Sequence, residues 1–522
     1  MTKTETLIDG KDEDQKEEGQ NGATTTAAAR GLKEPASIFA KLIYPASLLA
    51  SMSIWLLAIR APLWLDETLA YWQVSGGFAK VWTRSALMPS SLGYLYTLWF
   101  AKSILGSHEI ALKIPSTLAM LGAVYFLFRA TRVLFDQEFA FLACIFYCLE
   151  YNVVFAATDA RPYAFALLTT NLAIFAFIVW MRGHEMRQAF LFGVAAAGIL
   201  YFHYLFAAIL PAFAIYYLAV RYRSIKADAR QLAVALGTFT VIAVPLIFRI
   251  ASLYQTKVTH VVQELHHPVL ATLNTLAPAQ TLIGFVAAAF LAALLRRFRL
   301  PGRDCFPSGL LCLLLALVPA AALFSVDAVA STHLVIPRYL TIVAPGSALT
   351  WALLTSRIDS RALRQIFCVG LVGLTVIQCF RSPLSRRHEL NFKQAHEFVN
   401  ANVAVDRAPV LICSAFIESD FEPMPADRSS ENALVSQVSY YPVDAPFVFL
   451  PMDLNEETVR IGSQAVLSAA QRQERFLVIA PPTSYPIVDW IANYSRGGFT
   501  ARVQGTFDEI VVVEFRPTAK SD

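Results

Sequence analysis

Long apolar segments recur along most of the chain and constrain its fold more than any other feature. The first, residues 37–59, is long enough to cross the roughly 30 Å hydrocarbon core of a bilayer as a helix. Ten further apolar segments follow: residues 114–128, 139–156, 163–181, 189–201, 205–220, 232–248, 277–295, 308–324, 339–355 and 366–380. We therefore predict a polytopic α-helical membrane protein with about 11 transmembrane helices, since only helices or closed barrels satisfy the backbone polar groups in lipid.

Composition excludes several other classes of protein. Of the 522 residues, 56% are hydrophobic and only 16% are charged, which is too apolar for an ordinary soluble protein. The net charge of +4 is small and the basic residues are scattered through short connections, so no nucleic-acid partner is expected. Most of the seven cysteines lie in apolar segments, which predicts no disulfide framework and no zinc site. We expect no metal and no other cofactor.

The basic residues alternate between the connections and so predict the topology. Fifteen lysines and arginines lie around residues 129–132, 182–187, 221–230, 296–303 and 357–364, whereas the intervening short connections hold four: Arg161, Arg249, Lys257 and Arg338. The positive-inside rule places the first set in the cytoplasm and the second outside. Three arginines at residues 381–387 depart from this pattern, although long translocated domains follow the rule weakly. We expect a multi-pass protein of the cell inner (plasma) membrane.

Three regions are expected along the chain. Residues 1–37 are polar, acidic and low in complexity, which predicts a disordered cytoplasmic tail. Residues 38–384 form the membrane domain. Residues 385–522 alternate between strand and helix patterns, which predicts a soluble α/β domain on the extracytoplasmic side. This last region has no glycine-rich phosphate loop, so we assign it no nucleotide binding.

Within the membrane domain, the outer-face loop 60–113 interleaves aromatic and basic residues. Such a mixture suits amphipathic helices that lie along the membrane surface. The alternative is a short span at residues 92–105, which would reverse the topology of everything downstream.

The loop begins with the sequence WLDETLAYW, residues 64–72, whose centre is the acidic pair Asp66 and Glu67. A carboxylate near a membrane surface bears a desolvation cost, so its hydrogen bonding can be tuned for chemistry. An acidic pair after a hydrophobic helix is, however, more often a solvated loop or a helix cap. Its significance therefore depends on the other outer connections.

Those connections carry further polar residues on the same predicted side of the membrane. Each has an ordinary structural explanation by itself, such as an arginine that snorkels to the interface or a histidine that caps a helix. Together they place several carboxylates, two arginines and a histidine on one membrane face, and a longer outer loop, residues 254–267, adds Glu264, His266 and His267. The candidates are Asp159 and Arg161 in ATDARPY, His203 and Tyr204, and Arg338 and Tyr339 in IPRYL.

At this point the sequence resembles a known family. The motifs WLDE, HEIALKIPS, RATRVLF, TDARPYAFAL and a late RYL arrive in the order found in GT-C glycosyltransferases, and they are most similar to the bacterial group related to protein O-mannosyltransferases and aminoarabinose (lipid A) transferases. The resemblance covers about residues 66–345. The chain departs from it at Lys113, where arginine is expected before I-P-S, and at residues 89–93, which lack the usual bulky apolar residue after proline. These departures leave the donor and acceptor open.

The resemblance implies a reaction and a site. The donor is a sugar on a polyprenyl phosphate, and the acceptor is a glycan, a lipid or a protein. A carboxylate can activate the acceptor hydroxyl while arginines neutralise the departing phosphate, and a single displacement inverts the anomeric centre. The implied roles are Asp66 as general base, Glu67 as supporting acid, Asp159 as second acid, Arg161 and Arg338 as phosphate ligands, and His203, Tyr204 and Tyr339 in the same pocket.

Two hypotheses from other classes remain. A transporter or lipid flippase also needs buried charges, but such proteins more often show internal repeats and helices broken near the midplane. A non-catalytic assembly or receptor protein would use its outer domain instead. Removing the carboxylate discriminates between these classes, because a transferase should lose turnover and still bind its lipid donor.

Overall fold

The structure is a computed structural model that describes residues 38–87, 91–222, 225–256, 268–298, 306–330, 335–381 and 390–518. It contains two compact units, Met1–Ile43 and Tyr44–Asp522, which are considered separately. The predicted tail, residues 1–37, and most of the outer loop 254–267 lie outside the described residues. The predicted domain limits at residues 384 and 385 stay a prediction.

One to three helices lie at every predicted membrane segment. They are α1 (Ile38–Ala58), α5 (Glu109–Leu134), α6 (Gln137–Leu149) with α7 (Tyr151–Thr158), α8 (Tyr163–Gly183), α9 (Met186–Phe202), η1 (Tyr204–Ile209) with α10 (Leu210–Arg221), α11 (Ile225–Thr256), α13 (Ala279–Leu294), α14 (Phe306–Ala330), α15 (Pro337–Leu340) with η4 (Thr341–Val343) and α16 (Ala344–Thr355), and α17 (Arg361–Arg381). A short helix, α12 (Pro268–Leu276), precedes α13.

Not all of these helices are long enough to span a membrane by themselves. Within the described residues, seven are long and apolar enough, or up to eight if the bent pair α6 and α7 forms one span. Two others, α9 and α13, are apolar but shorter. The polytopic helical fold is confirmed, whereas the count of 11 spans is not.

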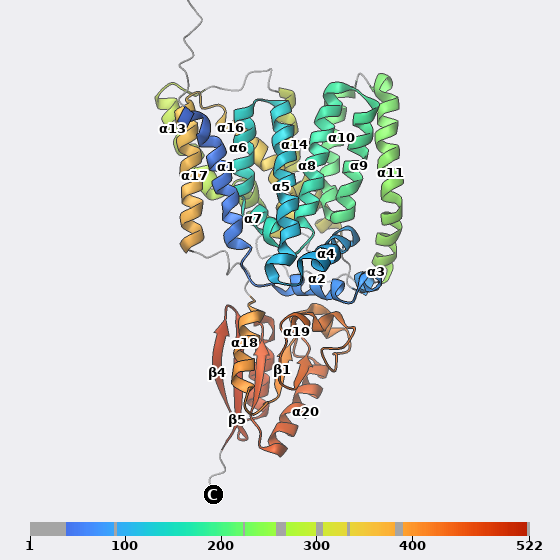
Figure 1. The fold of residues 1–522 in the computed structure, drawn as a ribbon, viewed down its shortest axis with the longest axis vertical. Helices are drawn as coiled ribbons and strands as arrows, with labels where there is room; N and C mark the ends of the chain where they lie inside the picture. Colours follow the sequence, from blue (N-terminus) through green and yellow to red (C-terminus); the bar gives the residue numbers. More distant parts are fainter. Residues whose placement is uncertain are drawn as a thin grey trace, which may run out of the picture. The chain divides into compact units, whose positions relative to one another are not determined.

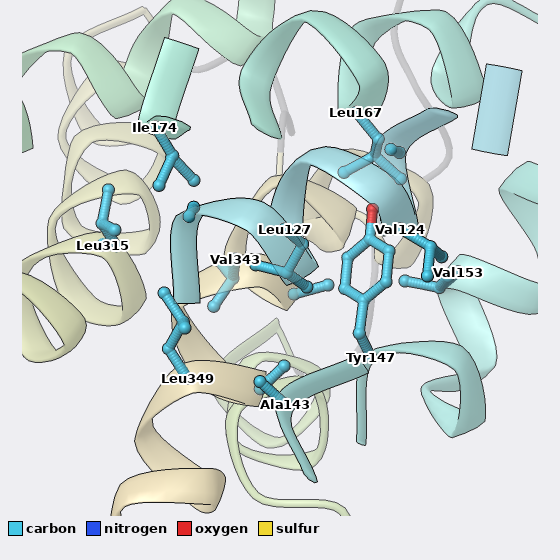
Figure 2. Close-up of a cluster of buried hydrophobic side chains, with 14 of the residues drawn as sticks. Val124, Leu127, Ala143, Tyr147, Val153, Leu167, Ile174, Leu315, Val343 and Leu349 are labelled. Carbon is cyan, nitrogen blue, oxygen red and sulfur yellow. The ribbon is translucent and has the colours of Figure 1, made fainter. Parts of the chain in front are cut away.

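Close backbone approaches hold the bundle together. A side chain at Gly193 in α9 would place its Cβ 2.5 Å from the carbonyl oxygen of Ala235 in α11, and one at Gly346 in α16 would lie 2.2 Å from the backbone of Leu315 in α14. Glycine therefore permits these helices to touch, and Figure 1 shows α9 beside α11. Figure 2 shows part of the buried cluster, to which five different helices contribute Leu127, Tyr147, Leu167, Leu315 and Leu349.

One sharp break interrupts the bundle. Helices α6 and α7 meet at an angle of 74°. Glu150 lies at the break, and its Oε2 accepts a hydrogen bond of 2.8 Å from the backbone N–H of Val153, so it caps α7. Since α7 ends at Thr158, the break directs the chain to the turn that carries Asp159 and Arg161.

Between α1 and α5 lie α2 (Leu65–Ser75), α3 (Phe78–Leu87) and α4 (Leu92–Leu105). Figure 1 shows α2 and α3 at a large angle to α5 and α8. Helix α3 exposes two large aromatic side chains, Phe78 at 58% and Trp82 at 56%, as expected at a lipid interface. Helix α4 is not among the described helices that are apolar enough to span a bilayer. These features favour surface helices over the alternative of a short span.

The C-terminal part is a five-stranded mixed sheet. Strands β1 (Val410–Cys413), β2 (Phe447–Leu450), β3 (Phe476–Ala480), β4 (Phe499–Phe507) and β5 (Ile510–Pro517) are arranged in the order β2-β1-β3-β5-β4. Strand β1 is parallel to β2 and β3, whereas β5 is antiparallel to β3 and β4. The accompanying helices are α18 (Phe392–Val403), α19 (Ser436–Tyr440), α20 (Glu456–Arg472) and α21 (Tyr485–Tyr494). The predicted α/β fold of this region is confirmed.

Both faces of this sheet are covered. Side chains alternate between faces along each strand, so Leu411 and Val478 pack with α20 and α21, while Ile412 and Ile479 belong to a second cluster. This second cluster also contains Leu63, Leu65, Leu69 and Trp72 from the acidic loop and α2. The sheet and the loop therefore share one hydrophobic core.

Candidate active site

Asp66 lies in the first turn of α2, where a carboxylate interacts favourably with the helix dipole. Its Oδ2 is 2.9 Å from Nη1 of Arg338 and 3.4 Å from Nη2 of Arg161. Nη1 of Arg161 also donates a hydrogen bond of 3.1 Å to the backbone carbonyl of Asp66. Three of the predicted site residues, which are far apart in the sequence, thus lie together, and their roles stay predictions.

The two arginines come from different elements. Arg161 lies in the turn between α7 and α8, and Arg338 lies in α15. The Arg338 guanidinium is 5.6 Å from the ring centroid of Trp64 and 5.6 Å from that of Tyr339, so aromatic faces fix its position.

This cluster has unused hydrogen-bonding capacity. The Nε atoms of Arg161 and Arg338 and the Nδ1 atom of His203 are buried, and none has a hydrogen-bond partner within the described parts of the chain. Both guanidinium groups form ion pairs with the same carboxylate, Asp66, so they have donors that Asp66 does not use. Buried guanidinium donors without a partner suit an anion such as a phosphate.

His203 caps the C-terminus of α9 and reaches the same place. Its ring centroid is 5.3 Å from that of Tyr163 and 5.4 Å from that of Tyr339. Burial lowers the pKa of His203 to about 3, and the positive charges of Arg161 and Arg338 act in the same direction. The imidazole is therefore neutral at physiological pH. Tyr204 stacks on it at 5.8 Å but is 52% exposed, so it lies at the rim.

Glu67 is completely buried and joins two segments of the site. Its Oε1 accepts a hydrogen bond of 2.6 Å from the backbone N–H of Ala160, and its Oε2 accepts one of 3.1 Å from that of Trp64. The first bond ties α2 to the turn that carries Arg161. The second satisfies a free amide at the start of α2. Glu67 therefore holds the start of α2 and the turn at Ala160 in place.

Lys113 is the residue that departed from the expected arginine. It is 1% exposed, its Nζ donates a hydrogen bond of 2.6 Å to the carbonyl of Ala61, and the same atom is 3.9 Å from Oε2 of Glu67. Asp159 is also buried, at 1% exposure, and directly precedes Ala160. Lys113 therefore holds the acidic loop at Ala61 and lies beside Glu67. Its position in the HEIALKIPS motif was the signal in the sequence that could have identified it.

Sequence reasoning missed the contribution of the C-terminal region to this loop. The hydroxyl of Tyr441 accepts a hydrogen bond of 2.8 Å from the backbone N–H of Leu63 and donates one of 2.6 Å to Glu109. Tyr441 is more than 300 residues distant from both partners. No local pattern in the sequence connects them.

Within the described residues, no cluster of three or more His, Cys, Asp or Glu side chains could hold a metal ion.

Comparisons with known proteins concern the fold of the chain. Residues 90–248 match the family described as dolichyl-phosphate-mannose-protein mannosyltransferase. Among solved structures, ArnT from Cupriavidus metallidurans bound to undecaprenyl phosphate has a TM-score of 0.51 at 10% identity, with 91% of this chain and 98% of the ArnT chain covered. Its apo form has a TM-score of 0.50, also at 10% identity, with 91% and 97% covered. No curated protein matches the chain.

A third solved structure, the oligosaccharyltransferase of Archaeoglobus fulgidus tethered to an acceptor peptide, has a TM-score of 0.46 at 11% identity, with 89% of this chain and 73% of that chain covered. The likeness to ArnT extends over most of the chain and shows a shared fold. The family match contains the turn with Asp159 and Arg161 and the His203 position. The resemblance drawn from the motifs is thus confirmed: the chain has the GT-C fold of ArnT, and residues 90–248 are similar to the dolichyl-phosphate-mannose-protein mannosyltransferase family.

Proposed function

We propose that this protein is a glycosyltransferase that moves a sugar from a polyprenyl-phosphate donor to a glycan, lipid or protein acceptor at the cell surface. The observation that carries the proposal is the position of the Asp66 carboxylate, within 2.9 Å and 3.4 Å of two guanidinium groups. A general base and a phosphate site are the two components that such a transfer needs. The undecaprenyl phosphate bound to ArnT supports this class of donor.

The reaction follows from the charges. Asp66 accepts the proton of the acceptor hydroxyl as its oxygen attacks the anomeric carbon. The bond between that carbon and the phosphate oxygen breaks, and the phosphate leaves with the electron pair. Charge-assisted hydrogen bonds from Arg161 and Arg338 stabilise the negative charge that develops on it. One displacement inverts the anomeric centre, so no covalent intermediate is required.

The ion pairs of the free site have a consequence for this sequence of events. A donor phosphate would compete with the Asp66 carboxylate for the same two arginines, because both anions use the same guanidinium groups. Donor binding would then release a carboxylate oxygen to accept the proton. His203, held neutral, could add a hydrogen bond to the phosphate, while Glu67 and Asp159 support the turn that carries Arg161.

We place the site on the extracytoplasmic side of the inner (plasma) membrane, since most basic residues of the short connections lie at the other predicted face. A nucleotide sugar would require a cytoplasmic site that holds a diphosphate and usually a metal. The connections predicted to be cytoplasmic are short and mainly basic, and two of their acidic residues already have partners: Asp136 caps α6, and Glu138 pairs with Arg361 and Arg364. The outer connections carry the carboxylates instead.

The test is to offer purified protein, in detergent with chelator, either a polyprenyl-phosphate sugar or the matching nucleotide sugar. Transfer from the first is expected, and transfer from the nucleotide sugar alone would refute the proposal. Asp66→Asn should lower turnover by about a hundredfold to ten-thousandfold, the usual contribution of a general base, while donor binding persists. A transporter or flippase would instead move its lipid without any transfer.

Asp136→Asn is the matched control for this variant. The same substitution, aspartate to asparagine, is made here at the predicted cytoplasmic end of the bundle. The Oδ1 of Asp136 accepts a hydrogen bond of 2.8 Å from the backbone N–H of Phe139 and so caps α6. The control should retain near-normal turnover. Equal losses in both variants would mean that Asp66 acts through stability, and near-normal turnover in Asp66→Asn would move the base elsewhere, with Asp159 next.

A further inference from the structure

The loop that carries Asp66 is held by the C-terminal sheet region as well as by the membrane helices. From that contact we infer that Tyr441 and its partners position the general base, so that the C-terminal region is a working part of the active site. This inference rests on the proposed function for the role of Asp66. The contact itself rests on geometry.

The central contact is a relay through the Tyr441 hydroxyl. This oxygen accepts a hydrogen bond of 2.8 Å from the backbone N–H of Leu63 and donates one of 2.6 Å to Oε1 of Glu109. Leu63 is fully buried and lies three residues before Asp66. Three residues of chain reach at most about 10 Å, so fixing the amide of Leu63 restricts where Asp66 can lie.

A charge completes the relay. Oε2 of Glu109 is 3.2 Å from Nζ of Lys393 in α18, so Glu109 binds two side chains of the C-terminal region at once. Glu109 opens α5, the helix that also carries Lys113. The acidic loop is therefore fixed at Leu63 by Tyr441 and at Ala61 by Lys113, and both anchors lead back to α5.

A second set of contacts holds α2 itself. The hydroxyl oxygens of Thr68 and Ser436 are 3.4 Å apart, and both residues are fully buried. The ring of Tyr440 meets that of Tyr71 edge to face at 4.7 Å. Leu65, Leu69 and Trp72 share a hydrophobic cluster with residues of α18 and α19. One whole face of α2 thus packs on the C-terminal region, while Asp66 points to the arginines.

A third contact lies at the far end of α2. Arg84 in α3 is only 8% exposed, and its Nη2 is 2.8 Å from Oε2 of Glu431. The same guanidinium donates to the carbonyl of Trp72 and lies 4.3 Å from the centroid of its ring. Both ends of α2 are therefore tied to residues beyond 390, at Leu63 through Tyr441 and at Trp72 through Arg84 and Glu431.

The variant that tests this inference is Tyr441→Phe. It retains the ring in the hydrophobic cluster and removes only the hydroxyl, which leaves the Leu63 amide without its acceptor. We expect turnover to fall by about two- to tenfold, the usual effect of one net hydrogen bond, with unchanged binding of undecaprenyl phosphate. Hydrogen exchange of a peptide covering residues 60–72 should become faster, because the loop opens more often.

Tyr485→Phe is the matched control. The Tyr485 hydroxyl also donates to a backbone carbonyl, that of Glu509, but Tyr485 begins α21 on the other face of the sheet. It should change neither turnover nor loop exchange. Glu109→Gln is a second, milder variant, because it retains an acceptor for Tyr441 while losing the charge that faces Lys393. Its loss of turnover should be smaller than that of Tyr441→Phe.

The two readouts separate this inference from the proposed function. If wild-type protein transfers no polyprenyl-linked sugar, the proposed function fails, and the exchange comparison still reports whether Tyr441 holds the loop. If exchange over residues 60–72 is the same in Tyr441→Phe and the wild type, or if it rises without any loss of turnover, the positioning role is overturned. A fall in donor affinity equal to the fall in turnover would also contradict it.

Discussion

At the scale of single residues, the main feature of the site is that its two arginines share one carboxylate. Asp66 is the one carboxylate that forms an ion pair with Arg161 and Arg338 among the described residues, and buried nitrogen atoms of both arginines have no partner there. A guanidinium offers a planar fork of donors that matches a phosphate, which an ammonium group cannot do. The identity of these residues as arginine should therefore matter, beyond their charge.

This predicts a graded response at position 338. Arg338→Ala should weaken binding of undecaprenyl phosphate by on the order of 1.5 to 3 kcal/mol, or tenfold or more, since one charge-assisted interaction is lost. Arg338→Lys should recover only part of this affinity, because the fork and its stacking on Trp64 and Tyr339 are gone. Equilibrium binding of the lipid to purified protein measures both.

Arg361→Ala provides a control of the same chemical type. Arg361 lies 3.6 Å from Glu138 at the other end of the bundle and is 41% exposed. Its removal should leave lipid binding unchanged. Equal effects of Arg338→Lys and Arg338→Ala would show that the fork is unimportant, and no effect of either would place the phosphate elsewhere.

The sequence predicted part of this site because ordered motifs mark where the chain returns to the same membrane face. These motifs placed Asp66, Arg161, His203 and Arg338 on one membrane face. It could not predict that Glu67 accepts a bond from the amide of Ala160, since backbone donors leave no trace in residue type. The assigned roles of these residues stay predictions.

At the scale of elements, helix α18 joins the sheet to the loop through a buried histidine. His396 is 1% exposed, and its Nδ1–H donates a hydrogen bond of 2.7 Å to the carbonyl of Tyr441. Burial lowers the pKa of His396 to about 4, although the carbonyl acts in the opposite direction. The backbone of Tyr441 is thus held by a group that must remain neutral.

The pH dependence follows from this pKa. Below the usual histidine pKa of about 6.5 the unfolded chain binds a proton that the folded state refuses, so the free energy of unfolding falls as pH decreases. The loss from His396 begins near pH 6.5, is complete near pH 4 and reaches about 3 kcal/mol. Thermal unfolding of wild type and His396→Gln across this range measures it.

The comparison between these two proteins isolates the histidine, since every other titrating group is shared. The difference in stability between wild type and variant should shrink as pH falls from 6.5 to 4. A difference that stays constant over this range would show that His396 is protonated in the folded protein, or that its neighbourhood opens.

Helix positions were predictable because apolar periodicity is local, and the alternation of strand and helix patterns beyond residue 385 predicted the α/β fold that contains β2 and β3. The break between α6 and α7 was not predicted, since both halves are apolar and the cause is one capping glutamate, Glu150. The pairing of the strands and the contact of α19 with α2 depend on tertiary packing. Such long-range contacts leave no pattern in a single sequence.

At the scale of the whole molecule, the function depends on which side of the membrane the site occupies. Among the described helices, seven or eight are long and apolar enough to cross a membrane, whereas eleven membrane segments were predicted. Each crossing added or removed moves everything that follows it to the other side of the membrane. The basic residues provide the independent argument, because fifteen of nineteen in the short connections lie at one predicted face.

A cysteine-labelling experiment decides the side. Met186 is 46% exposed in a connection predicted to be cytoplasmic, and Ser468 is an exposed position on α20. In intact cells, a cysteine at Ser468 should react with a membrane-impermeant thiol reagent, whereas one at Met186 should react only after lysis. The described native cysteines are buried or partly buried, which keeps the background low. Reaction at Met186 with protection at Ser468 would invert the topology. The carboxylates and the phosphate site would then face the cytoplasm, where soluble nucleotide sugars are made, and the argument for a polyprenyl-linked donor would lose its basis.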